Sequence, residues 1–274
     1  MANQNIREVY PEAPLALVAL EVKFPSEAST KDFVTPSQKA FRDRLNLIGD
    51  WVIESSQHQE VQISLGPNPA QTVRSVNVPR ILTRYRSVAV SFPPDAITIE
   101  TTTYKGYAGF RQLVLAVLEA TQELLAPDSV ARMGLRYIDE IRVPDELGEN
   151  SPRWSDWLDD SLLPPKLPPA VRWAPEASMW TAGAQYQMGH DKFLVIRYGP
   201  QVGPVVTPQL RRPKVPPPGP VFLVDFDSSW QPDTLPSFDP KALIEICDLL
   251  HAPASATFES FITEKLRNVF RGKQ

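Results

Sequence analysis

The sequence is poor in cysteine and histidine and has no surplus of positive charge. Cys247 is its single cysteine, so no internal disulfide can form, and 28 Lys and Arg residues face 32 Asp and Glu, giving a net charge of −4. A protein that clamps nucleic acid needs the opposite balance. We see no pattern typical of a secretory signal, and no apolar run approaches the ~20 residues that span a bilayer. We therefore expect a cytoplasmic protein with no membrane segment.

Sequence motifs that carry familiar chemistry are also missing. The three histidines, His58, His190 and His251, have no zinc-ligand spacing with one another or with Cys247. The sequence contains no Gly-x-Ser-x-Gly nucleophile elbow and no Gly-x₄-Gly-Lys-Ser/Thr phosphate loop. It therefore predicts no metal and no cofactor, and it favours a non-enzymatic protein.

Proline is the abundant residue, at 29 of 274 positions. It is concentrated at 144–176 and 199–220, and since proline fixes φ and lacks a backbone donor, neither stretch is a regular helix or central strand. We interpret the first as a connector and the second as a long hairpin loop. The predicted organisation is an N-terminal α+β half at 1–143, the connector at 144–176, and a β-meander with a long kinked helix at 177–274. Together these parts are expected to form one structural unit.

Hydrophobic periodicity predicts the individual elements. Alternating apolar residues predict strands at 17–24, 60–65, 86–92, 97–104, 130–143, 179–188, 193–198 and 221–227. Helical spacing predicts helices at 36–53, at 107–125 and from Asp239 to the C-terminus, with a break or kink at Pro253. Hairpins dominate this order, so we expect an α+β fold: a mostly antiparallel sheet with helices packed on one face. The order also allows two similar halves that share the sheet.

Four short segments are distinctive when taken in order. They are YPEAP at 10–14, YKGYAGF at 104–110, GLRYIDEI at 134–141, and Leu250–His251 followed by Phe258 and Ile262–Thr263. Together they resemble a sporadically distributed family of uncharacterised bacterial proteins of similar length, in which Asn tends to replace Asp139. The resemblance implies a single unit and supplies no activity. The family's scattered distribution is typical of mobile or defence-linked genes.

The strand predicted at 130–143 contains the main candidate for a ligand site. Tyr137 and Asp139 lie on its more apolar face, which should point into the core. A buried carboxylate is costly unless it is paired, so Asp139 is either a structural Asp or the polar floor of a ligand cavity. Arg136 and His251 are further candidate lining residues. His251 precedes Pro253, and an alternative role for it is to cap the helix there.

Three functions from different classes remain open. The first is a non-enzymatic protein that binds another protein, as a regulator or neutralising partner in a defence or toxin-linked system, with Trp154 and Trp157 as anchors. The second is a small-molecule-binding protein or unfamiliar enzyme with a pocket near Asp139 and His251. The third, favoured least because of the net charge, is nucleic-acid binding through arginines at 80–86 and 211–214.

Overall fold

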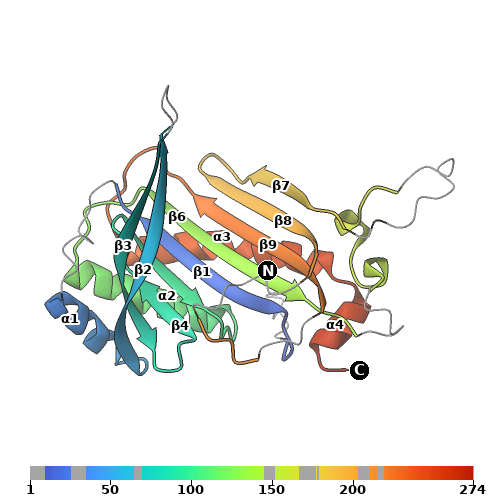
Figure 1. The fold of residues 1–274 in the computed structure, drawn as a ribbon, viewed down its shortest axis with the longest axis horizontal. Helices are drawn as coiled ribbons and strands as arrows, with labels where there is room; N and C mark the ends of the chain where they lie inside the picture. Colours follow the sequence, from blue (N-terminus) through green and yellow to red (C-terminus); the bar gives the residue numbers. More distant parts are fainter. Residues whose placement is uncertain are drawn as a thin grey trace, which may run out of the picture.

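The computed structural model describes residues 10–25, 35–64, 70–144, 152–166, 177, 179–202, 210–214 and 219–273. Its centre is one nine-stranded sheet in which the neighbouring strands pair antiparallel (Figure 1). In chain order the strands are β1 (Leu15–Lys23), β2 (Trp51–Ser64), β3 (Ala70–Thr83), β4 (Val88–Ser91), β5 (Ala96–Thr101), β6 (Arg132–Ile141), β7 (Ala182–Gln187), β8 (Lys192–Val202) and β9 (Pro220–Trp230).

The helices are α1 (Thr35–Leu45), α2 (Tyr107–Leu124), α3 (Pro240–Phe261) and α4 (Glu264–Phe270). The two long helices, α2 and α3, lie behind the sheet in Figure 1 and cover one of its faces. The predicted fold class is therefore confirmed: this is an α+β protein with helices packed on an antiparallel sheet.

The order of strands across the sheet is β2-β3-β4-β5-β1-β6-β9-β8-β7. The sheet has the same arrangement on each side of the central β1–β6 pair. The central strand pairs with the strand that comes last before a long helix. β1 and β5 precede α2 in this way, while β6 and β9 precede α3. β6 pairs with β1 on one side and with β9 on the other, so it joins the earlier strands to those that follow it. The two sets share one continuous sheet.

Strict alternation in β1 explains how the sheet faces its helices. Alternate residues of this strand are buried, and Val18, Leu20 and Val22 are fully buried in the core. The stripe Val114, Val117 and Leu118 of α2 belongs to the same core cluster. Burying such side chains contributes about 1.5–3 kcal/mol each, which makes this layer the main support for the residues described below.

Two predictions about elements were wrong, and a third is narrowed. The helix predicted at 36–53 ends at Leu45, and Trp51 already begins β2, because Asn46 turns the chain and its side chain accepts a hydrogen bond from the Trp51 N–H. No strand was predicted at 70–83, where β3 forms the second arm of a long hairpin with β2. α3 continues through Pro253 as one helix, so the break considered there is absent, while the alternative of a kink stays a prediction.

Of the predicted connector at 144–176, the structure describes residue 144 and residues 152–166. This part contains two short 3₁₀ turns at Trp154–Asp156 and Asp160–Leu162. The residues at 145–151 and 167–176 lie outside the described part of the chain, as do 203–209 and 215–218 of the predicted hairpin loop.

Candidate functional site

A cavity of about 200 Å³ lies between the sheet and its covering helices. This volume greatly exceeds the ~10–15 Å³ that one water molecule requires. Its wall comes from the chain before β1, the end of β6, the middle of β9, the turn into α2 and the second half of α3. The lining residues are Tyr10, Ala13, Pro14, Leu15, Tyr104, Gly106, Tyr107, Tyr137, Asp139, Phe226, His251, Ala254, Ser255, Phe258 and Glu259.

All four segments that the sequence analysis singled out contribute to this wall. They supply Tyr10 before β1, Tyr107 at the start of α2, Asp139 on β6 and His251 on α3. These segments are far apart in the sequence, and the sheet topology brings them together because β1 and β6 are neighbours. The cavity is thus the place where the distinctive parts of the chain meet.

Asp139 lies on the helix-covered face of β6, as predicted. It stands opposite Leu15 on β1 and Val224 on β9, and only 5% of its surface is exposed. Within the described part of the chain, no hydrogen bond or ion pair reaches its carboxyl group. Burial and, secondarily, the negative charge of Asp225 raise the pKa of Asp139 from 3.8 to about 8. The carboxyl group is therefore mainly protonated at neutral pH.

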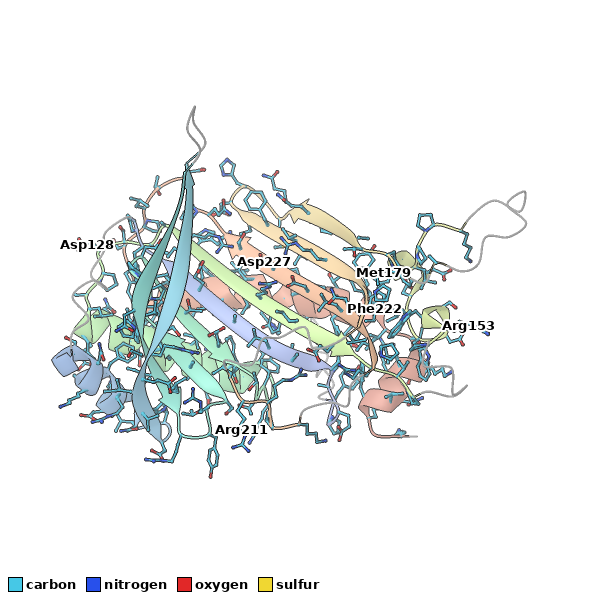
Figure 2. The ribbon with its side chains drawn as sticks, in the orientation of Figure 1. Asp128, Arg153, Met179, Arg211, Phe222 and Asp227 are labelled. Atoms are coloured by element: carbon cyan, nitrogen blue, oxygen red, sulfur yellow. The ribbon has the colours of Figure 1, made fainter. Side chains whose placement is uncertain are left out.

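Asp225 on β9 gives an instructive contrast because it is equally buried on the other face of the same sheet. Its carboxylate accepts two hydrogen bonds from Arg136, at 2.7 and 2.8 Å, and lies 3.5 Å from an Arg197 nitrogen. Arg136 therefore points away from the cavity, although it was proposed as a lining residue. Asp227, labelled in Figure 2, shares this face and lies 3.8 Å from Arg132. The described residues thus pair the Asp225 carboxylate on one face of the sheet and provide no partner for Asp139 on the other.

Tyr137 and His251 are brought together, as the sequence analysis expected of two lining residues. The Tyr137 hydroxyl lies 2.8 Å from Nδ1 of His251. The His251 ring stacks on Tyr107 with the ring centres 3.7 Å apart and the planes 6° from parallel. Burial raises the pKa of Tyr137 well above 10, so its hydroxyl keeps its proton at neutral pH. The imidazole is therefore held between two tyrosines and has a fixed orientation.

An ion pair between α2 and α3 holds the Tyr107 side of this arrangement. The Tyr107 hydroxyl donates to Asp248 at 2.7 Å, and Arg111 donates to both oxygens of the same carboxylate. Burial alone would raise the pKa of Asp248. The hydrogen bonds from Arg111 and Tyr107 together lower it by more, so the net shift of the pKa is downward. Asp248 stays ionised and positions Tyr107, which in turn supports the His251 ring.

Gly106 makes the turn that places Tyr107 at the cavity. Its φ of 113° lies in the region that side chains other than glycine's rarely adopt. A substitution at this position would strain the turn even though the space around its Cα is open. The glycine in the segment YKGYAGF is thus explained by backbone geometry.

The far end of the cavity contains a second carboxylate, which is already paired. The Tyr10 hydroxyl donates to Glu259 at 3.0 Å, and Arg267 lies 3.4 Å from the same carboxylate oxygen. Burial, together with the hydrogen bond to Glu259, raises the pKa of Tyr10 to about 12. This cluster ties the chain before β1 to α3 and α4, and so closes one side of the cavity.

The two tryptophans proposed as interaction anchors are buried within this molecule. Trp154 is 7% exposed and packs against Phe222, with the ring centres 5.2 Å apart. Trp157 is 4% exposed, and the Lys265 ammonium lies 3.9 Å above the centre of its ring. Both side chains help fix the segment 152–166 to the sheet and to the junction of α3 and α4.

The arginines considered for phosphate binding pair with carboxylates. Arg84 binds Asp50 and Arg86 binds Glu54. The segment 210–214 lies below β4 in Figure 2, where Arg211 is labelled, and its Arg212 donates to the buried Glu140 at 2.8 Å. These contacts offset the positive charge of Arg84, Arg86 and Arg212.

The described residues include no cluster of His, Cys, Asp or Glu that could hold a metal ion. None of the helices in the described ranges has the length and apolar character needed to cross a membrane. A scan against protein-family models and a search of curated proteins gave no match. The family resemblance stated above therefore stays an expectation.

Sequence reasoning missed most of the cavity wall. Tyr10, Tyr104, Tyr107 and Glu259 were not named as lining residues, although the first three lie in the distinctive segments. Their clustering in those segments was the available signal. Glu259 gave no such signal, because its place in the wall depends on α3 continuing as one helix through Pro253.

Proposed function

We propose that this protein binds a small organic molecule in the cavity between β6, α2 and α3. The observation that carries the proposal is the carboxyl group of Asp139, which is buried, faces the cavity and has no partner among the residues that the structure describes. Ligand sites are typically apolar hollows with a few convergent polar groups and a residue of perturbed pKa. The cavity has this composition, with the Tyr137 and His251 pair beside the carboxyl group.

The energetic argument concerns the cost of Asp139 to the empty protein. An unsatisfied buried polar group costs about 1–3 kcal/mol, and an ionised carboxylate costs more. Val224 and Leu15, its neighbours on either side, are apolar, and such a residue at 139 would extend the core without this cost. A bound molecule that hydrogen bonds to the carboxyl group would offset the cost, which supports a ligand-binding role.

The test compares ligand binding before and after the cavity is filled. A library of neutral, cationic and anionic fragments is screened by ligand-observed NMR against the wild-type protein and a Ser255→Phe variant, since Ser255 lines the cavity. The control is Ala256→Phe, because Ala256 is the next residue of α3 and is exposed. We expect hits that Ser255→Phe abolishes and Ala256→Phe retains. Hits that survive Ser255→Phe, or no hits at all, would overturn the proposal.

The protein-binding role in a defence or toxin-linked system stays a prediction. Because Trp154 and Trp157 are buried in this molecule, neither provides an exposed anchor for it. Purification of the tagged protein from its native host tests this role, and a stoichiometric protein partner is the result that would support it. The cytoplasmic location also stays a proposal, supported by the single cysteine, which is free and buried.

A further inference from the structure

The ionisable groups of the cavity wall include two carboxyl groups. Asp139 and Glu259 are its acidic residues, and the lining in the described part of the chain includes no Lys or Arg. Arg267 approaches Glu259 from outside the lining, and Arg111 is held by Asp248. A ligand that enters the cavity thus meets two carboxyl groups and, in the described lining, no Lys or Arg; the one imidazole, that of His251, is held against Tyr137 and Tyr107.

The rest of the wall is dominated by aromatic rings. Tyr104 and Tyr137 meet edge to face, with ring centres 6.1 Å apart and planes at 86°, so they form two perpendicular sides of a corner. Tyr107, Phe226 and Phe258 add further rings to the lining. The face of an aromatic ring attracts a cation, and the attraction is strongest in desolvated sites.

We infer that the ligand of this cavity is an organic ammonium ion, with its charged nitrogen against Asp139 and the aromatic corner and its carbon skeleton against Leu15, Phe226 and Phe258. The inference rests on the proposed function and adds the chemical class of the ligand. The ammonium group would supply the hydrogen-bond partner that Asp139 lacks, and its charge would favour the ionised form of the carboxyl group. Charge-assisted hydrogen bonds of this kind are shorter and stronger than those between neutral groups.

One feature of the wall would favour an anion instead. α2 begins at the cavity, and a helix N-terminus carries roughly half a positive charge. Tyr107 and Arg111 in the first turns of α2 are both bonded to Asp248, whose full negative charge lies beside that terminus. The balance of charges at the cavity therefore favours a cation, and an anionic probe is included in the test.

The experiment uses three probes of the same shape and different charge. Phenethylammonium, 2-phenylethanol and 3-phenylpropanoate are titrated into the full-length protein at pH 8 by isothermal calorimetry. The same titrations are made with Asp139→Asn and with Asp225→Asn, which removes a carboxylate of similar burial from the opposite face of the sheet. Circular dichroism and unfolding curves establish that each variant is folded.

We expect phenethylammonium to bind the wild-type protein at least about tenfold more tightly than either other probe. Asp139→Asn should weaken its binding by about tenfold or more, and Asp225→Asn should leave it within about twofold. Tighter binding of the neutral or anionic probe, abolished by Ser255→Phe, would overturn the inference while leaving the proposed function intact. Absence of binding by all three probes and by the fragment library would overturn both.

Discussion

Replacing Asp139 by Asn should stabilise the protein, and the gain should grow as the pH rises. The folded-state pKa of this carboxyl group is raised from 3.8 to about 8, so the folded protein holds a proton that the unfolded chain releases near pH 4. The contribution of this carboxyl group to the free energy of unfolding is therefore fully present below pH 4 and is lost as the pH rises towards 8. Asn has nearly the same shape as Asp and does not ionise, so the variant does not incur this loss.

The magnitude follows from the two pKa values. Between pH 5 and pH 7 the wild-type protein should lose about 1.4 kcal/mol of unfolding free energy per pH unit relative to the variant. Over pH 5 to pH 8 the difference should reach about 4 kcal/mol, a large part of the ~5–15 kcal/mol that stabilises a typical domain. Wild type and variant have the same other titratable and charged groups around the site, so the comparison isolates residue 139. These groups include Tyr10, Tyr104, Tyr107, Tyr137, Asp225, Asp248, His251, Glu259 and Arg267.

The assay is urea unfolding followed by circular dichroism at pH 5, 6, 7 and 8. Asp225→Asn is the matched control, because it takes the acceptor from Arg136 and Arg197 and should destabilise the protein by about 1–2 kcal/mol. A gain from Asp139→Asn that does not grow with pH, or a variant less stable than wild type at pH 8, would refute the reasoning that Asp139 is buried without a partner.

Four further predictions concern the cavity, the core and the buried cysteine. Phenethylammonium affinity should rise about tenfold per pH unit between pH 6 and pH 7.5, because Asp139 must release its proton to pair with the cation; calorimetry that gives a flat or falling profile would contradict this. Tyr107→Phe removes the hydrogen bond to Asp248 and should cost about 1 kcal/mol in urea unfolding, while Leu20→Ala should cost about 2–5 kcal/mol because that side chain is fully buried. Burial raises the pKa of Cys247 to about 12, so a thiol reagent should modify it only after unfolding, and fast labelling of the native protein would count against the buried position.

Local patterns predicted the parts of the fold that depend on one face being buried. The hairpin of β4 and β5, the helix α2 and the inward side of β6 all follow from alternation or helical spacing. The same alternation assigns Arg136 to the outer face of β6, where the structure has it. Naming it as a cavity residue overlooked that consecutive strand residues point to opposite faces.

The long β2–β3 hairpin could not be read from the same patterns. Ile48 and Val52 continue the spacing of α1, so the helix was extended across them, yet Ile48 is half-exposed in a turn and Val52 lies in β2. Pro79 is an unusual residue inside a strand, because proline cannot donate to a neighbouring strand. In the structure the Pro79 carbonyl accepts a hydrogen bond from the Phe92 N–H, so Pro79 takes part in the sheet as an acceptor only.

The cavity itself required the topology. Asp139 and His251 could be proposed from the sequence, but the pairing of Tyr137 with His251 and the stacking on Tyr107 depend on how α3 crosses β6 and α2. Nothing in the spacing of Tyr10 and Glu259 shows that they meet, since 249 positions separate them along the chain.

The most direct test of this account is a pH titration of the Asp139 carboxyl carbon by ¹³C NMR, with Asp139→Asn used to assign the signal. The account predicts a midpoint near pH 8 in the free protein and a shift to lower pH when phenethylammonium is added. A midpoint near 4 that does not respond to the cation would show that the carboxyl group is hydrated or paired, and would contradict both the proposed cavity chemistry and the ligand class inferred from it.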